Sequence, residues 1–289
     1  MTRIIDRFGT GSPVFSFEFF PPKSDEGAEA LMATVLDLQE AVNPDYVSVT
    51  YGAGGTTRER TQQVVSRIQN QIGLPAMAHL TCVAATVGEI DEVVNRLVAD
   101  GIENILALRG DPPKDQKNFQ VPEGGFAHAS ELIAHLARRK ELCIGAAAYP
   151  EGHPESADAQ DDLRWTIHKV EQGVSFLVTQ MIFDNEHYFR FTERLRGCGV
   201  HVPVVPGIMP ITNVAQIDRF TKMCGVEIPS SLSKRMHGYQ DDPASVMAIG
   251  IEHAIEQCRD LLARGAPGLH FYTLNRSLAT RGVLAALKG

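Results

Sequence analysis

The chain has 289 residues, of which 44% are hydrophobic and 21% charged, with a formal net charge of −8 at pH 7. It is long enough to bury a substantial core, and because it has no basic block, nucleic acid is an unexpected partner. Its five scattered cysteines lack the spacing of a disulfide framework or a zinc site. The sequence also has no secretory signal and no apolar run of about 18 residues, so we expect a soluble cytoplasmic protein with no membrane segment.

Apolar and β-branched runs of strand length alternate along the chain with amphipathic, helix-like stretches. The expected strands are 15–18, 45–50, 75–80, 102–108, 142–148, 176–180, 202–205 and 268–272. The expected helices include 31–38, preceded by cap residues at 24–26, then a polar helix through 70, 87–100, one starting near 129, 156–172, one ending near 196, helices reaching 257–263, and one closing the chain.

Eight strand-then-helix units without a break are typical of a parallel sheet covered by helices, and eight such units close a (β/α)8 TIM barrel. We therefore predict one α/β barrel domain spanning residues 1–289. An open doubly wound sheet is the structural alternative, but the first strand-to-helix turn lacks the G-x-G-x-x-G of a dinucleotide fold.

Polar residues gather at the expected strand ends, which form one face of such a barrel. Glu18 lies among four phenylalanines and is followed by two prolines, so desolvation is expected to raise its pKa, as a general acid requires. The alternative is that Glu18 simply faces water at the end of an apolar strand.

The other candidates have ordinary alternatives as well. Asp111 is either functional or a turn former, His79 is either functional or a satisfied core histidine, and His153 fits a loop. Gln180, inside a strand, favours function because a buried amide needs partners. The glycines at 52, 54 and 55 resemble a phosphate loop only weakly, and neither a metal site nor an activated serine or cysteine nucleophile is indicated.

Eight ordered motifs together resemble the bacterial, single-barrel form of the methylenetetrahydrofolate reductase family. They are Phe17-Glu-Phe-Phe-Pro-Pro22, Val49-Thr-Tyr-Gly-Ala53, His79-Leu-Thr-Cys82, Ala107-Leu-Arg-Gly-Asp111, Ala148-Tyr-Pro-Glu151 with His153-Pro154, Thr179-Gln180, Pro206-Gly-Ile208 and Phe271-Tyr-Thr-Leu-Asn-Arg276. The resemblance covers nearly the whole chain.

The resemblance implies an FAD-containing barrel in which NADH or NADPH reduces the flavin, leaves, and is replaced by 5,10-methylenetetrahydrofolate, which is reduced to 5-methyltetrahydrofolate. By position, Glu18 matches the general acid, and Asp111 a catalytic aspartate that contacts the pterin and lowers the flavin potential. The remaining folate contacts would be Gln180, Gln216, Phe220, Leu274 and Arg276; those to the nicotinamide would be Thr50, Gln180 and Phe220.

Positions matching FAD contacts are spread over several strand ends and the helix at 156–172. They are Tyr51, Ala53, His79, Arg109, Gly110, Asp111, Ala129, Tyr149, His153, Ser156, Asp162, Trp165, His168 and Lys169. Trp165 and His168 depart from the polar residue and arginine of well-studied bacterial members, so the adenosine and diphosphate contacts there are expected to differ. Val174 replaces a common alanine, and its larger side chain is expected to loosen the helix seat beneath the flavin and to affect FAD affinity.

Three alternatives stay open at this point. In one, the same enzyme physiologically runs in the oxidative direction, since its residues serve both directions. The chain is alternatively the folate-binding component of a complex in which a ferredoxin-type partner delivers electrons, or a non-catalytic scaffold. The resemblance also implies a homo-oligomer.

Overall fold

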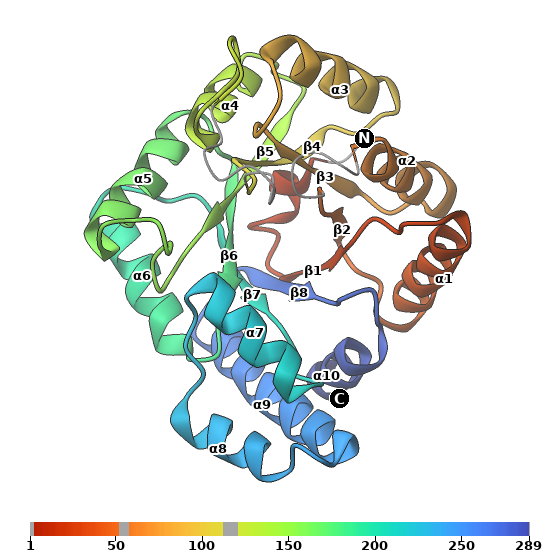
Figure 1. Cartoon of the computed structure of the whole chain (residues 1–289), viewed down its shortest axis with the longest axis vertical. Helices are drawn as coiled ribbons and strands as arrows, with labels where there is room; N and C mark the ends of the chain where they lie inside the picture. The colour runs from red at the N-terminus through yellow and green to blue at the C-terminus, as the bar shows by residue number, and fades with distance from the viewer. Residues whose placement is uncertain (1–2, 52–57, 112–120, 289) are drawn as a thin grey trace.

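The structure, a computed structural model, describes residues 3–51, 58–111 and 121–288. Within these ranges eight parallel strands close into a barrel in chain order, with β8 bonded back to β1 (Figure 1). The strands are β1 (Val14–Phe19), β2 (Tyr46–Val49), β3 (Ala76–Thr81), β4 (Asn104–Leu108), β5 (Cys143–Ala148), β6 (Phe176–Met181), β7 (Val204–Ile208) and β8 (Gly268–Tyr272). The predicted (β/α)8 barrel is confirmed, and closure rules out the open sheet.

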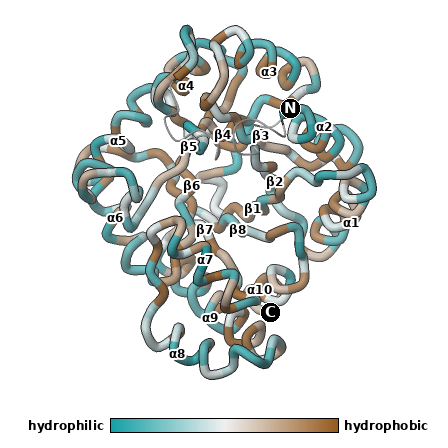
Figure 2. Tube along the Cα trace, viewed as in Figure 1, coloured by the Kyte–Doolittle hydropathy of each residue, from teal (hydrophilic) through white to brown (hydrophobic). Residues whose placement is uncertain are grey.

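Helices surround the barrel (Figure 1). They are η1 (Ile4–Arg7), α1 (Asp25–Val42), α2 (Arg58–Arg67), η3 (Ile68–Ile72), α3 (Val87–Ala99), α4 (Ala129–Leu136), α5 (Ala159–Glu171), α6 (Asn185–Gly197), α7 (Val214–Cys224), α8 (Ser230–Gly238), α9 (Pro243–Ala263) and α10 (Leu278–Lys288). In Figure 2, brown apolar and teal hydrophilic stretches alternate along these helices, as amphipathic helices require. None of the helices in the described ranges combines the length and apolarity needed to cross a membrane.

Capping residues set where the helices begin. The cap expected near Ser24 is confirmed, because its hydroxyl accepts the N–H of Gly27 at 3.1 Å. Helix α5 begins at Ala159 rather than near residue 156, because the Asp158 carboxylate accepts the N–H groups of two following residues at 2.8 Å. Ser156 therefore lies in the loop before the helix.

The two faces of each strand have different surroundings. On β1, Phe17 and Phe19 are fully buried in the apolar layer between barrel and helices, where Leu31 and Val35 of α1 also lie. Burial of such a side chain contributes about 1.5–3 kcal/mol. The alternate positions, Ser16 and Glu18, face the barrel interior.

Strand β7 lies further along the chain than the sequence predicted. We expected 202–205 with a loop from Pro206 onward, whereas Pro206 lies inside the strand. The register between β6 and β7 is irregular between Val178 and Met181, and the Gly207 N–H donates to the Thr179 hydroxyl at 2.9 Å. This irregularity accommodates Pro206, which has no backbone N–H to donate to the neighbouring strand.

Candidate active site

Two adjoining cavities open at the carboxyl ends of the strands, the face where active sites of this fold are built. The larger, of about 340 Å³, we call the mouth cavity; its lining includes Glu18, Thr50, Tyr51, His79, Asp111, Gln180, Phe220, Met223, Cys224, Tyr272 and Leu274. The smaller, of about 230 Å³, we call the side cavity; its lining includes Arg109, His128, Ala129, Ser130, His153, Glu155, Ser156, Asp161, Asp162, Trp165 and Lys169. Leu108, Ala147 and Tyr149 line both, so the two cavities are contiguous.

Glu18 is buried in the wall of the mouth cavity, with 9% of its surface exposed. The expected phenylalanine environment is wrong, because alternation along β1 turns Phe17 and Phe19 to the opposite face. Instead, Glu18 Oε2 lies 3.3 Å from Nε2 of His79 on β3 and 3.4 Å from Nε2 of His270 on β8. The alternative of a solvent-facing glutamate is also excluded.

These histidines change the expected protonation of Glu18. Burial raises its pKa, but the electrostatic interaction with His79 and the hydrogen bond from His270 together lower it by a larger amount, so the net pKa lies below its ordinary value. Burial lowers the pKa of His79 to about 4, against the opposing pull of Glu18. We therefore assign a carboxylate to Glu18 and a neutral imidazole to His79 at pH 7. The raised pKa expected from the sequence is wrong for the protein alone.

One further polar residue, Ser16, extends this cluster. The Ser16 hydroxyl lies 2.8 Å from Nδ1 of His270, whose Nε2 lies 3.4 Å from Glu18. Because a carboxylate only accepts, we assign the imidazole proton to Nε2 and the hydroxyl proton to the Ser16–Nδ1 bond. Ser16 and His270 are completely buried and pair directly in the β1–β8 register.

The rest of the mouth cavity is held by contacts between neighbouring loops. Gln180 is half-buried, and its side-chain oxygen accepts the N–H of Met181 at 2.9 Å, which orients the carboxamide. Leu274 adopts a left-handed backbone, with φ of 52°. The next residue, Asn275, accepts the N–H of Phe20 at 2.7 Å and donates to its carbonyl at 2.9 Å. These two hydrogen bonds hold the loop after β8 against the end of β1.

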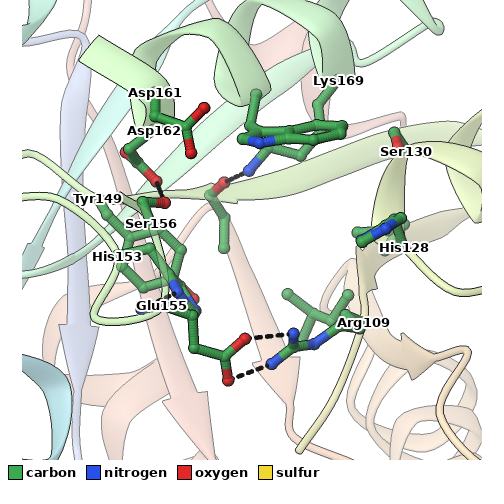
Figure 3. A pocket seen from close by; sticks show the side chains of 15 residues that line it. Arg109, His128, Ser130, Tyr149, His153, Glu155, Ser156, Asp161, Asp162 and Lys169 are labelled. Atoms are coloured by element: carbon green, nitrogen blue, oxygen red, sulfur yellow. Dashed lines mark hydrogen bonds and ion pairs between the residues drawn. The ribbon is translucent and has the colours of Figure 1, made fainter. Parts of the chain in front are cut away.

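The side cavity is lined by ionic and aromatic groups (Figure 3). The Lys169 ammonium donates to the Ala147 carbonyl at 2.6 Å, and burial lowers its pKa to about 8, although Asp162 acts to raise it. Ser156 donates to Asp162 at 3.4 Å. The Trp165 ring, 45% of whose residue surface is exposed, stacks on His128 with centroids 5.4 Å apart.

Gly110 separates the residues of the two cavities. Its backbone has φ of 83°, and a Cβ there would lie 2.7 Å from Cγ1 of Val83. On either side, Arg109 lines the side cavity and Asp111 the mouth cavity. Only glycine fits this turn without strain, so one short segment serves both cavities.

Comparison with known proteins decides the family. The family model described as Methylenetetrahydrofolate reductase matches residues 2–288. The 5,10-methylenetetrahydrofolate reductase of Escherichia coli (strain K12) is 38% identical over 263 residues, which cover 91% of this chain and 86% of that protein. The chain belongs to the methylenetetrahydrofolate reductase family. Methylenetetrahydrofolate reductase (NADH) 1 of Zea mays is 37% identical and matches 99% of this chain, but only 50% of its own length.

Membership in this family agrees with the resemblance found in the motifs. The chain spans about half the length of the first eukaryotic relatives it matches. Among solved structures, a Clostridium thermocellum protein that binds two copies of 5-methyl-5,6,7,8-tetrahydrofolic acid is similar, with a TM-score of 0.63 and 14% identity. The match covers 99% of this chain and 96% of that one. At 14% identity, this match shows a similar fold only.

Most positions matched to the reductase family line one of the two cavities, but not all do. Gln216, Arg276, Gly110 and His168 line neither cavity. His168 instead lies beside Trp165 and 3.9 Å from Glu171 on α5. Ala53 and the glycines at 52, 54 and 55 lie outside the described residues. Across ranges 3–51, 58–111 and 121–288, we find no group of three or more metal-ligating side chains.

Sequence reasoning missed Ser16, His270, Tyr272 and Glu155. A signal existed for the first three, because Ser16 with Glu18 and His270 with Tyr272 are polar pairs two residues apart in buried strands. Such spacing places both members on one strand face. Glu155 carries no comparable signal, since its partner Arg109 is 46 residues away in the chain.

Proposed function

We propose that the protein is an FAD-dependent methylenetetrahydrofolate reductase that uses NADH or NADPH as the reductant. In this reaction the folate's methylene iminium accepts a hydride and becomes a methyl group, while the ring-opened nitrogen N10 receives a proton. Bound FAD would accept two electrons from the nicotinamide and deliver them to the folate in a separate step. The relatives named as reductases of this substrate support the proposal.

The residues of the side cavity fit the adenosine diphosphate portion of FAD. Arg109 and Lys169 are the cations suited to the diphosphate, and the buried ammonium with a pKa lowered to about 8 lies where an anion would relieve its desolvation. Ser156 and Asp162 suit ribose hydroxyls, and the exposed Trp165 ring suits the base. Continuity through Tyr149 gives the flavin ring a path into the mouth cavity.

The mouth cavity fits the flavin ring and the folate pterin. Asp111 and Gln180 line it with polar groups, and the Phe220 ring suits stacking on a flat heterocycle. In this arrangement Thr50 and Gln180 would position the nicotinamide before the folate replaces it. Asp111 would place negative charge near the flavin and so disfavour its anionic reduced form.

The buried Glu18 cluster is the observation that carries the proposal. At neutral pH its carboxylate is ionised in the protein alone, so the acid role requires that ligand binding favour the protonated form. Covering the mouth cavity with flat ligands removes water from Glu18 and weakens the solvation of its charge, which raises the pKa. The protonated carboxyl then donates to N10 and becomes a carboxylate again, which the imidazole N–H of His270 stabilises within 3.4 Å, and it takes up its next proton from solvent once the product leaves.

Replacing Glu18 with Gln tests this assignment by rapid kinetics of the two half-reactions. We expect folate reduction to fall by about 10²- to 10⁴-fold, the usual contribution of a general acid, and flavin reduction by nicotinamide to change little. Glu141→Gln, which removes a carboxylate before β5 at the opposite end of the barrel, should alter neither. Equal loss in both half-reactions for Glu18→Gln would show that the carboxyl is structural instead.

A further inference from the structure

The side cavity contains an ion pair whose cation faces the same space as the expected diphosphate. Arg109 follows β4, and Glu155 lies in the loop after β5. Nη1 of the arginine lies 2.5 Å from Oε2 of the glutamate and Nη2 lies 2.8 Å from Oε1, which is the two-pronged geometry of an arginine on a carboxylate (Figure 3). A phosphate oxygen pair would use the same two N–H groups.

The charges of the side cavity are poorly arranged for an anion while this pair is closed. Among the described residues that line it, Asp161, Asp162 and Glu155 outnumber the two strong cations, Arg109 and Lys169. The side chain of Asp161 is engaged by Arg164 at 2.7 Å. With Asp161 paired in this way, Asp162 and Glu155 balance the two cations, so a bound diphosphate would meet a lining with no net positive charge.

Of the three carboxylates that line the side cavity, Glu155 can turn into solvent most easily. Its side chain is 59% exposed, whereas Asp162 is 5% exposed and accepts a hydrogen bond from Ser156. Even a bidentate pair separates at modest cost when its carboxylate is this exposed, because water solvates the carboxylate as it leaves. Glu155 can thus rotate into solvent at small cost, while Arg109 stays at the cavity, its Nε donating to the Gly110 carbonyl at 3.3 Å.

We propose that Glu155 is a built-in competitor of the cofactor diphosphate for the Arg109 guanidinium. The inference rests on the proposed function, because it takes the diphosphate to be that of FAD. Binding exchanges one bidentate partner of Arg109 for another, and the carboxylate moves to water. Glu155 therefore weakens FAD binding and sets how readily the protein releases its cofactor.

Flavin-free full-length protein titrated with FAD tests this competition. Trp165 is the only tryptophan of the chain and lines the side cavity, so quenching of its fluorescence reports occupancy directly. Glu155→Gln should bind FAD roughly two- to tenfold more tightly than the wild type, as expected for loss of one exposed ion pair and one like charge. Glu141→Gln is the matched control, since it also breaks a surface Arg–Glu pair, with Arg139 at 3.0 Å, and should leave the affinity unchanged.

A double-mutant cycle with Arg109→Gln separates competition from general charge repulsion. If Glu155 acts through Arg109, Glu155→Gln should have little effect once the arginine is gone; an equal gain in both backgrounds would overturn the proposal. Weaker or unchanged binding by Glu155→Gln, with a wild type that binds FAD, would also overturn it and leave the proposed function standing. If neither the wild type nor the variants bind FAD, the proposed function fails and the competitor fails with it.

Discussion

The Glu18 cluster of the mouth cavity is buried, whereas the Arg109–Glu155 pair of the side cavity is partly exposed. In the mouth cavity, Glu18, His79 and His270 come from inward positions of three strands and are almost completely buried, and the pKa values of Glu18 and His79 lie below their ordinary values. In the side cavity, Arg109 and Glu155 extend from loops and remain partly exposed. Buried charges are costly to rearrange, whereas exposed pairs exchange partners easily. The difference suggests fixed chemistry in one place and exchangeable binding in the other.

Lys169 is the exception in the side cavity, because its charge is buried there, and replacing it should give the largest effect on FAD binding. Lys169→Met should weaken FAD binding by roughly 10- to 100-fold, the range expected for loss of a charge-assisted hydrogen bond. The flavin-free variant should nevertheless be more stable than the wild type by roughly 2 kcal/mol at neutral pH, since no ammonium is desolvated. Lys140→Met, at an exposed site, is the control in both measurements.

The pH dependence identifies the cause of that stability gain. Folding lowers the pKa of Lys169 from 10.5 to about 8, so between these values the unfolded chain binds more protons and wild-type stability rises with pH. The advantage of Lys169→Met should therefore be full below pH 8 and shrink as the pH rises toward 10.5. Denaturant unfolding at several pH values measures it; a constant advantage would point to packing.

Gly110 tests whether the two cavities depend on one turn. Gly110→Ala should destabilise the fold by roughly 2–4 kcal/mol, because it combines a left-handed backbone with a Cβ only 2.7 Å from Val83. Gly199→Ala, with φ of 79° and no atom within 4 Å, isolates the backbone cost and should lose roughly 1 kcal/mol. Thermal unfolding compares them. Similar losses would mean that the neighbours of Gly110 yield, and that the turn is less constrained than we argue.

Ser16 gives the smallest expected effect, confined to the mouth cavity. Ser16→Ala removes the hydroxyl on Nδ1 of His270, which weakens the bond from Nε2 to Glu18 and raises the pKa of the carboxyl. Folate reduction should change less than about tenfold, with its alkaline limb displaced upward by roughly half a pH unit. FAD affinity should be unaffected. An unmoved pH profile with an intact fold would show that Ser16 does not influence the pKa of Glu18.

The sequence predicted the barrel because each strand-helix unit is encoded locally, by apolar runs and caps such as Ser24. It also singled out Glu18, Arg109 and Lys169, which line the two cavities. It failed where the outcome depended on which face a residue takes or on a distant partner. Phe17 and Phe19 adjoin Glu18 in the chain but point away from it, whereas His79 and His270 lie far along the chain and meet it across the barrel.

The central claim is that a cofactor held in the side cavity carries electrons to a folate in the mouth cavity. The most direct test is an anaerobic visible spectrum of the purified protein with FAD, recorded before NADH or NADPH, after it, and then after 5,10-methylenetetrahydrofolate. We predict that the yellow flavin absorbance is bleached by the nicotinamide and restored by the folate. A bound flavin that neither nicotinamide bleaches would point to a partner that delivers electrons, and a protein that FAD cannot reconstitute would contradict the account.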